Sequence, residues 1–262
     1  MAMHRNLPLP DAPSRNRPAP RLRWTRLASP AAFYPLAGRL APWFFALALA
    51  WLAIGLWLGF AVAPTDAQQG EVYRIIFIHV PAAWMSMFIY VLMAGYSALA
   101  LVLRTRVSSL MAQALAPTGA MFTFLALWTG ALWGKPTWGT YWVWDARLTS
   151  ELILLFLYLG YIALASAIEE PRRAERACAV LALVGVANIP IIYFSVQWWN
   201  TLHQGASVSL TAAPTMAATM LAGMLAMALA CWMYTIAVAL VRVRCLLRER
   251  GEIGAPAREA MP

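Results

Sequence analysis

The stretch WGKPTWGTYWVWDARLTSELILLFLYLGY, residues 133–161, joins a segment with four tryptophans to a run of apolar residues. A helix that crosses the hydrocarbon core of a bilayer needs about 20 mostly apolar residues. The apolar run extends from 149 to 168 and reaches that length. The stretch therefore predicts a membrane-spanning helix that begins directly after a tryptophan-rich loop.

The rest of the chain has the same character. Of its 262 residues 62% are hydrophobic, whereas apolar residues make up about half of a water-soluble domain. Further apolar segments lie at 43–63, 80–103, 110–132, 177–199 and 215–241. Pro117 and Pro190 fall inside two of them and predict kinks. We therefore expect an all-α bundle of six transmembrane helices.

The basic residues predict the orientation. Only Arg74, Lys135 and Arg147 fall on the side of the tryptophan loop, and the other seventeen of the twenty Lys and Arg residues fall on the opposite side. By the positive-inside rule, both termini are cytoplasmic and the loop is periplasmic. The expected organisation is a basic, flexible cytoplasmic arm (1–41), a six-helix domain (42–242) with the tryptophan loop at 133–148, and a cytoplasmic tail (243–262).

The sequence lacks the motifs of nucleotide-binding proteins, of hydrolases and of proteins that bind zinc through paired histidines or cysteines. It contains no phosphate-binding loop, no Gly-x-Ser-x-Gly elbow, no His-Glu-x-x-His pair and no Cys-x-x-Cys. The net charge of +9 lies in short arginine clusters near the spans, which favours anionic lipid headgroups over nucleic acid as their partner. We therefore predict no catalytic residue, and an ATP-driven role would need another subunit.

Two of the three histidines, His79 and His203, fall at predicted outer helix ends on either side of the tryptophan loop. Zinc normally takes three or four protein ligands, whereas haem iron takes four nitrogens from the porphyrin and leaves two axial positions. The pair therefore fits haem. The alternative is that each histidine only bonds to a backbone carbonyl or a lipid headgroup.

The tryptophan loop also allows two interpretations. Gly134, Pro136 and Gly139 disfavour a continuous helix, so we expect an irregular segment over 133–148. If residues 141–144 are extended, Trp142 and Trp144 project to one side and form a shelf for a flat macrocycle. The alternative is an interfacial aromatic belt, in which tryptophan is enriched because its ring is amphipathic.

Three segments, RIIFIHVPAAW (74–84), the opening stretch (133–161) and VQWWNTLHQGAS (196–207), resemble the CcmC family of haem-delivery proteins and its tryptophan-rich "WWD" motif. The resemblance implies that His79 and His203 are axial ligands of a non-covalent, transiently held haem b. It implies further that the porphyrin is contacted by Trp133, Gly134, Trp138, Gly139, Trp142, Trp144 and Asp145.

The same resemblance implies a role in cytochrome c maturation at the bacterial inner membrane. Haem would pass to the periplasmic chaperone CcmE, in a complex with CcmA, CcmB and CcmD. Arg74, Lys135 or Arg147 would neutralise the haem propionates, although Arg147 can instead pair with Glu151, four residues on. A permease subunit of an ABC-type exporter is the alternative function, and a quinone or electron-transfer subunit is a third.

Overall fold

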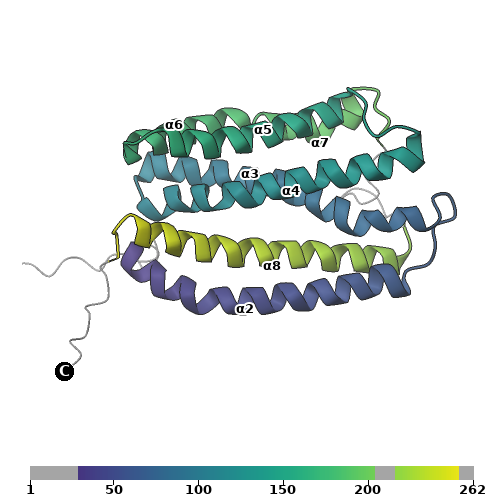
Figure 1. Ribbon diagram of the computed structural model, residues 1–262, viewed down its shortest axis with the longest axis horizontal. Coiled ribbons are helices and arrows are strands. Elements are labelled where there is room, and N and C mark those ends of the chain that lie inside the picture. The colour runs from purple at the N-terminus through teal and green to yellow at the C-terminus, as the bar shows by residue number, and fades with distance from the viewer. Residues whose placement is uncertain (1–28, 204–215, 254–262) are drawn as a thin grey trace, which may run out of the picture.

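The computed structural model describes residues 29–203 and 216–253. Within these residues the chain is helical, and the helices form three layers whose axes run along the long dimension of the molecule (Figure 1). One outer layer pairs α2 with α8, the middle layer pairs α3 with α4, and the other outer layer holds α5, α6 and α7.

Six helical stretches are long and apolar enough to cross a membrane, which confirms the all-α prediction. Their helices are α2 (Pro30–Trp57) with a π-helical turn η1 (Leu58–Val62), the 3-10 turn η2 (Glu71–Ile75) with α3 (Ile76–Leu103), α4 (Arg106–Trp138), α5 (Ala146–Ala167), α6 (Pro171–Gly185) with α7 (Asn188–Trp198), and α8 (Ala218–Glu249). The start of α2 and the end of α8 lie at one end of the bundle, and the tryptophan loop lies at the other (Figure 1). Which end faces the periplasm stays a prediction.

The first and last helices are longer than the apolar pattern indicates. Helix α2 begins at Pro30 instead of 43, because Ser29 caps its first turn by accepting from the Ala32 amide and Pro30 suits the first helical position. The expected flexible arm therefore loses residues 30–41 to a helix, and residues 1–28 lie outside the described part. Helix α8 continues to Glu249 and so takes in Cys245, which we expected in the tail.

The fifth span is broken rather than smoothly kinked. Helix α6 ends at Gly185, and α7 begins at Asn188 after a short turn. Pro190 has no amide hydrogen for the Val186 carbonyl, which accepts from the Ile189 amide instead. The Asn188 side chain donates to the Ser150 carbonyl of α5, 2.9 Å away, so α7 is tied to a neighbouring helix at the break.

Pro117 interrupts the hydrogen-bond pattern of α4 near a charged side chain from another layer. Arg242 of α8 donates to the Thr118 hydroxyl at 2.7 Å and to the Ala114 carbonyl at 3.3 Å. An arginine inside a membrane helix is therefore held by polar groups around a proline, as expected for irregular helix at membrane depth.

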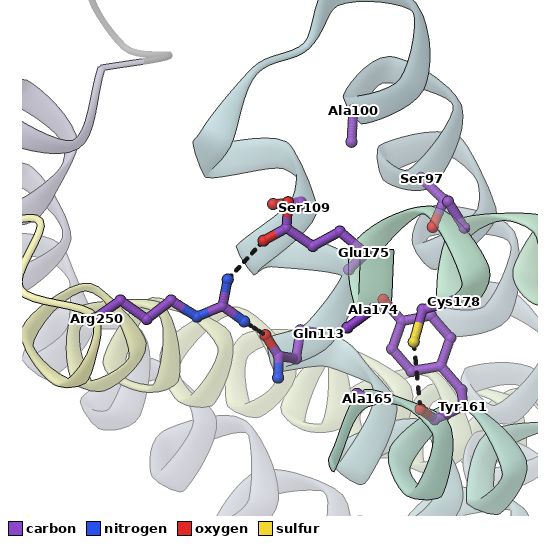
Figure 2. Close-up of a pocket in the computed structure, with 12 residues that line it drawn as sticks. Ser97, Ala100, Ser109, Gln113, Tyr161, Ala165, Ala174, Glu175, Cys178 and Arg250 are labelled. Atoms are coloured by element: carbon purple, nitrogen blue, oxygen red, sulfur yellow. Dashed lines mark hydrogen bonds and ion pairs between the residues drawn. The ribbon is translucent and has the colours of Figure 1, made fainter. Parts of the chain in front are cut away.

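An ionic network closes the end of the bundle opposite the tryptophan loop. Arg106 of α4 pairs with Glu175 of α6 and with Glu252, which follows α8. Arg250 pairs with the same Glu175 at 2.6 Å and donates to Gln113 of α4 at 2.5 Å (Figure 2). Two arginines and two glutamates thus neutralise one another and join helices of all three layers.

Candidate functional site

His79 lies in the first turn of α3, and its ring faces α4. Its Nδ1 is 3.1 Å from the Thr129 hydroxyl of α4. A Cβ on Gly130 would lie 3.0 Å from the Cε1 of His79, so the absence of a side chain there lets the imidazole pack directly against the helix. The predicted span begins at residue 80, whereas α3 begins at Ile76, after the 3-10 turn η2.

His203 follows the end of α7 by five residues and comes close to His79 in space. The two ring centroids are 6.3 Å apart, and the ring planes are tilted by 35°. Both histidines line a cavity of about 40 Å³ between α3, α4 and α5. That volume accepts a few water molecules.

Each histidine has a tryptophan beside it. The Trp133 ring meets His79 edge to face at 5.6 Å, and the Trp138 ring lies 5.9 Å from His203. Both tryptophans line the same cavity. The Trp133 indole donates to the Gln69 side chain at 2.7 Å, which ties the end of α4 to the segment before η2.

The tryptophan segment is more helical than expected. Helix α4 continues through Trp133, Gly134 and Pro136 to Trp138, so the irregular part is confined to residues 139–145. The helix ends at Gly139, whose φ of 81° is in the left-handed region that favours glycine. The expectation was wrong over 133–138 because a single proline removes only one helical donor, and the membrane setting favours keeping the other backbone bonds.

Two further residues shape the end of α4. Gly134 allows the loop to fold back, because a Cβ there would lie 3.0 Å from the Thr140 carbonyl oxygen. Lys135 donates to the Gly139 carbonyl at 3.0 Å, and its ammonium group lies 5.4 Å from the centroid of the Tyr141 ring.

Trp142 and Trp144 pack against each other, and the shelf for a macrocycle stays a prediction. Their centroids are 5.3 Å apart in an edge-to-face arrangement, and Trp144 is 77% exposed. Neither lines the cavity of the two histidines. The Trp142 indole nitrogen is buried and finds no hydrogen-bond partner among the described residues.

Asp145 begins α5. One carboxylate oxygen accepts from the Leu148 amide at 2.8 Å and so caps the helix. The other oxygen, Oδ2, is buried without a hydrogen-bond partner among the residues that the structure describes. Asp145 therefore has one carboxylate oxygen that the described residues leave unsatisfied.

The two candidate arginines for the haem propionates, Arg147 and Arg74, lie in different parts of the structure. Arg147 lines the cavity and donates to the Ile192 carbonyl of α7 at 2.6 Å, and the described residues show no ion pair between it and Glu151. Arg74 lies elsewhere: it pairs with Glu71 and donates to the Gly59 and Ala63 carbonyls, where it holds the end of the first span.

Glu151 is a residue of the cavity that the sequence indicated only as a possible partner of Arg147. It lies one turn into α5, is 7% exposed and lines the floor of the cavity. The Ser86 hydroxyl of α3 donates to its carboxyl group at 2.7 Å. An acidic residue inside an apolar span was the available signal, because polar groups at membrane depth have partners and roles.

Comparison with known proteins assigns the chain to a family. A family model described as heme exporter protein C matches residues 23–255. The chain belongs to the CcmC family. It is 51% identical to the heme exporter protein C of Bradyrhizobium diazoefficiens over 225 residues, which cover 86% of this chain and 85% of the relative.

Other members of the CcmC family match nearly as well. Identity to heme exporter protein C of Escherichia coli is 53% over 182 residues, or 70% of this chain and 74% of the relative. A putative cytochrome c biosynthesis ccmC-like mitochondrial protein of Marchantia polymorpha is 51% identical over 157 residues, or 60% and 66%. The six apolar helices and the bacterial relatives make this CcmC-family chain a multi-pass inner-membrane protein.

Proposed function

We propose that the chain binds haem between His79 and His203 and delivers it to the periplasmic chaperone CcmE during cytochrome c maturation. Membership of a family described as heme exporter protein C supports a role in haem handling. The name of the Marchantia polymorpha relative supports the link to cytochrome c biosynthesis. Haem is the cargo in this proposal and is held as non-covalent haem b.

One observation carries the proposal: the two histidines, far apart in the sequence, have ring centroids 6.3 Å apart at the tryptophan end of the bundle. A metal–imidazole bond of about 2 Å on each side of one metal, with the half-width of each ring added, gives a separation of roughly 6 Å. No group of three or more His, Cys, Asp or Glu that would suit another metal occurs among the described residues. The donor set therefore fits a metal that brings its remaining ligands with it, as haem iron does.

The size of the cavity bears on how haem would sit. A volume of about 40 Å³ is far smaller than a porphyrin, so most of the macrocycle would extend beyond the cavity. Trp133 and Trp138 would contact it beside the iron, and the exposed Trp144 with Trp142 would offer a surface farther out. An exposed macrocycle suits a protein that passes its cargo on.

Three groups are candidates for the haem propionates. Arg147 lines the cavity, Lys135 lies at the end of α4, and the Trp142 indole lacks an acceptor among the described residues. A charge-assisted hydrogen bond to a carboxylate contributes about 1.5–3 kcal/mol. Arg74 is not among these candidates, because its guanidinium group pairs with Glu71 and donates to the Gly59 carbonyl at the end of the first span.

The expected partners follow from the same family membership. We propose a membrane complex with CcmA, CcmB and CcmD, in which ATP hydrolysis takes place on another subunit, since this sequence has no phosphate-binding loop. The sequence favours delivery over a permease, because a permease path needs polar groups along the middle of the bundle and the apolar segments contain few of them. Ser86, Glu151 and Asn188 are in fact buried there, but they bond to each other or to backbone within the bundle.

The test is an absorption spectrum of the purified protein, produced with haem and chaperone, beside His79→Ala and His203→Ala. We expect a low-spin spectrum for the unaltered chain and a high-spin spectrum or lost haem for each variant. His4→Ala is the matched control, because His4 lies in the N-terminal arm. An unchanged spectrum in both site variants would refute axial ligation and return the tryptophans to an interfacial belt.

A further inference from the structure

The Thr129 hydroxyl lies between the backbone of its own helix and the ring of His79. Its Oγ1 donates to the Leu125 carbonyl at 2.6 Å and lies 3.1 Å from the Nδ1 of His79. Thr129 is 6% exposed, so solvent does not compete for either contact. The hydroxyl therefore connects α4 to the imidazole through a short and enclosed chain of hydrogen bonds.

The number of protons on these atoms determines which way the bonds run. A hydroxyl group has one proton to donate, and a backbone carbonyl can only accept. At 2.6 Å the Leu125 carbonyl takes that proton, because otherwise two acceptor oxygens would face each other with no proton between them. The remaining lone pairs of the Thr129 oxygen can then only accept, so the 3.1 Å contact is a hydrogen bond only if the Nδ1 of His79 carries a hydrogen. The His79 ring also forms a hydrogen bond with the Ala126 backbone of α4.

We propose that Thr129 is a positioning residue that holds His79 in the tautomer protonated at Nδ1 and so makes Nε2 the iron ligand. In a neutral imidazole the nitrogen without hydrogen carries the lone pair that binds a metal, and a bond to the other nitrogen fixes the ring. Gly130 also positions the imidazole ring of His79, since its missing side chain lets the ring lie against α4. The inference rests on the proposed haem site and deepens it.

The tautomer can be measured without haem. Nitrogen-15 chemical shifts of labelled histidines in the full-length chain distinguish the two neutral tautomers, and His4→Gln and His203→Gln variants assign the signals. We expect His79 to be protonated at Nδ1 in the unaltered chain and in Thr129→Ser. Thr129→Val, which replaces the hydroxyl with a methyl group, should populate the other tautomer. A His79 protonated at Nε2 in the unaltered chain would overturn the proposal.

Haem binding provides the second readout. Loss of a hydrogen bond to the second nitrogen of a metal-binding histidine typically lowers affinity by about 10- to 100-fold. We expect that loss in Thr129→Val and near-normal affinity in Thr129→Ser. Thr123→Val is the matched control, because Thr123 is also buried in α4 and donates to a carbonyl, that of Gly119, one turn back.

The outcomes separate the two proposals. If His79→Ala changes the haem spectrum but Thr129→Val binds haem as tightly as Thr123→Val, the role of Thr129 is wrong and the haem site stands. If His79→Ala leaves the spectrum unchanged, the haem site is wrong, and the nitrogen shifts still decide the tautomer. Equal loss in Thr129→Val and Thr129→Ser would assign the effect to packing and overturn the positioning role.

Discussion

Substitution of Gly130 by alanine should weaken haem binding without weakening the fold. The new Cβ would lie 3.0 Å from the Cε1 of His79, whereas carbon atoms in contact prefer at least about 3.5 Å. The imidazole ring must therefore move away from α4 by a few tenths of an ångström. Such a shift weakens the contact between Nδ1 and the Thr129 hydroxyl, which at 3.1 Å is already near the long end of the range for a hydrogen bond.

The expected result is a loss of haem affinity of about 10-fold or more, with a smaller low-spin fraction. The assay is a haem titration of the purified protein in detergent or lipid nanodiscs, followed by absorption. Alanine stabilises the interior of a helix by about 1 kcal/mol relative to glycine. The unfolding temperature of the haem-free variant should therefore not fall. Loss of haem together with unchanged unfolding would identify the effect as one on the histidine.

Gly95→Ala is the control, because Gly95 lies in the same long helix as His79 and has no atom within 4 Å of its built Cβ. It should bind haem as the unaltered chain does. The reasoning would be refuted if Gly130→Ala kept full affinity and an unchanged spectrum. It would also be refuted if both alanine variants lost haem equally.

Three other substitutions test the surroundings of the site. Arg147→Met removes the donor to the Ile192 carbonyl and should lower the unfolding free energy by about 1.5–3 kcal/mol in the haem-free protein, measured by thermal unfolding in detergent; an unchanged unfolding temperature would show that this bond does not hold α7. Trp142→Phe keeps an aromatic ring but removes the unpaired indole donor, so it should reduce the preference for haem over its dimethyl ester in a titration; an unchanged preference would exclude a propionate contact. Glu175→Gln weakens pairs with Arg106 and Arg250 that are partly exposed, so it should cost about 1 kcal/mol or less and should lose its effect in high salt, while haem affinity stays the same.

The apolar runs alone predicted the six spans, because a bilayer sets the length of a helix and leaves few alternatives for the backbone. The ends of the helices were less predictable. Ser29 and Pro30 begin α2 well before the apolar run, and the capping bond of Ser29 is a local signal that hydropathy does not contain. At Pro136 the sequence predicted an end of helix that the structure does not have, because one missing donor does not end a helix whose other hydrogen bonds are intact.

Some residues of the candidate site could also be predicted from the sequence, and others could not. The proximity of His79 and His203 could be expected, since a chain with few ionisable residues places two histidines at predicted outer helix ends. Thr129 and Gly130 were not, because in the sequence they are two small residues inside a long apolar run. Their importance depends on the packing of α3 against α4, which brings them to the ring of a residue fifty positions away.

The two proposed iron ligands lie in different backbone settings. His79 belongs to a continuous helix of 28 residues, whereas His203 lies outside the helices, five residues beyond the end of α7. Helix α7 itself is tied to α5 through Asn188 and Ile192, but a residue beyond the end of a helix can move without distorting the bundle, so we expect the bond to His203 to yield first. Cargo would then leave in a fixed order, detaching from the movable ligand while the rigid one still holds it.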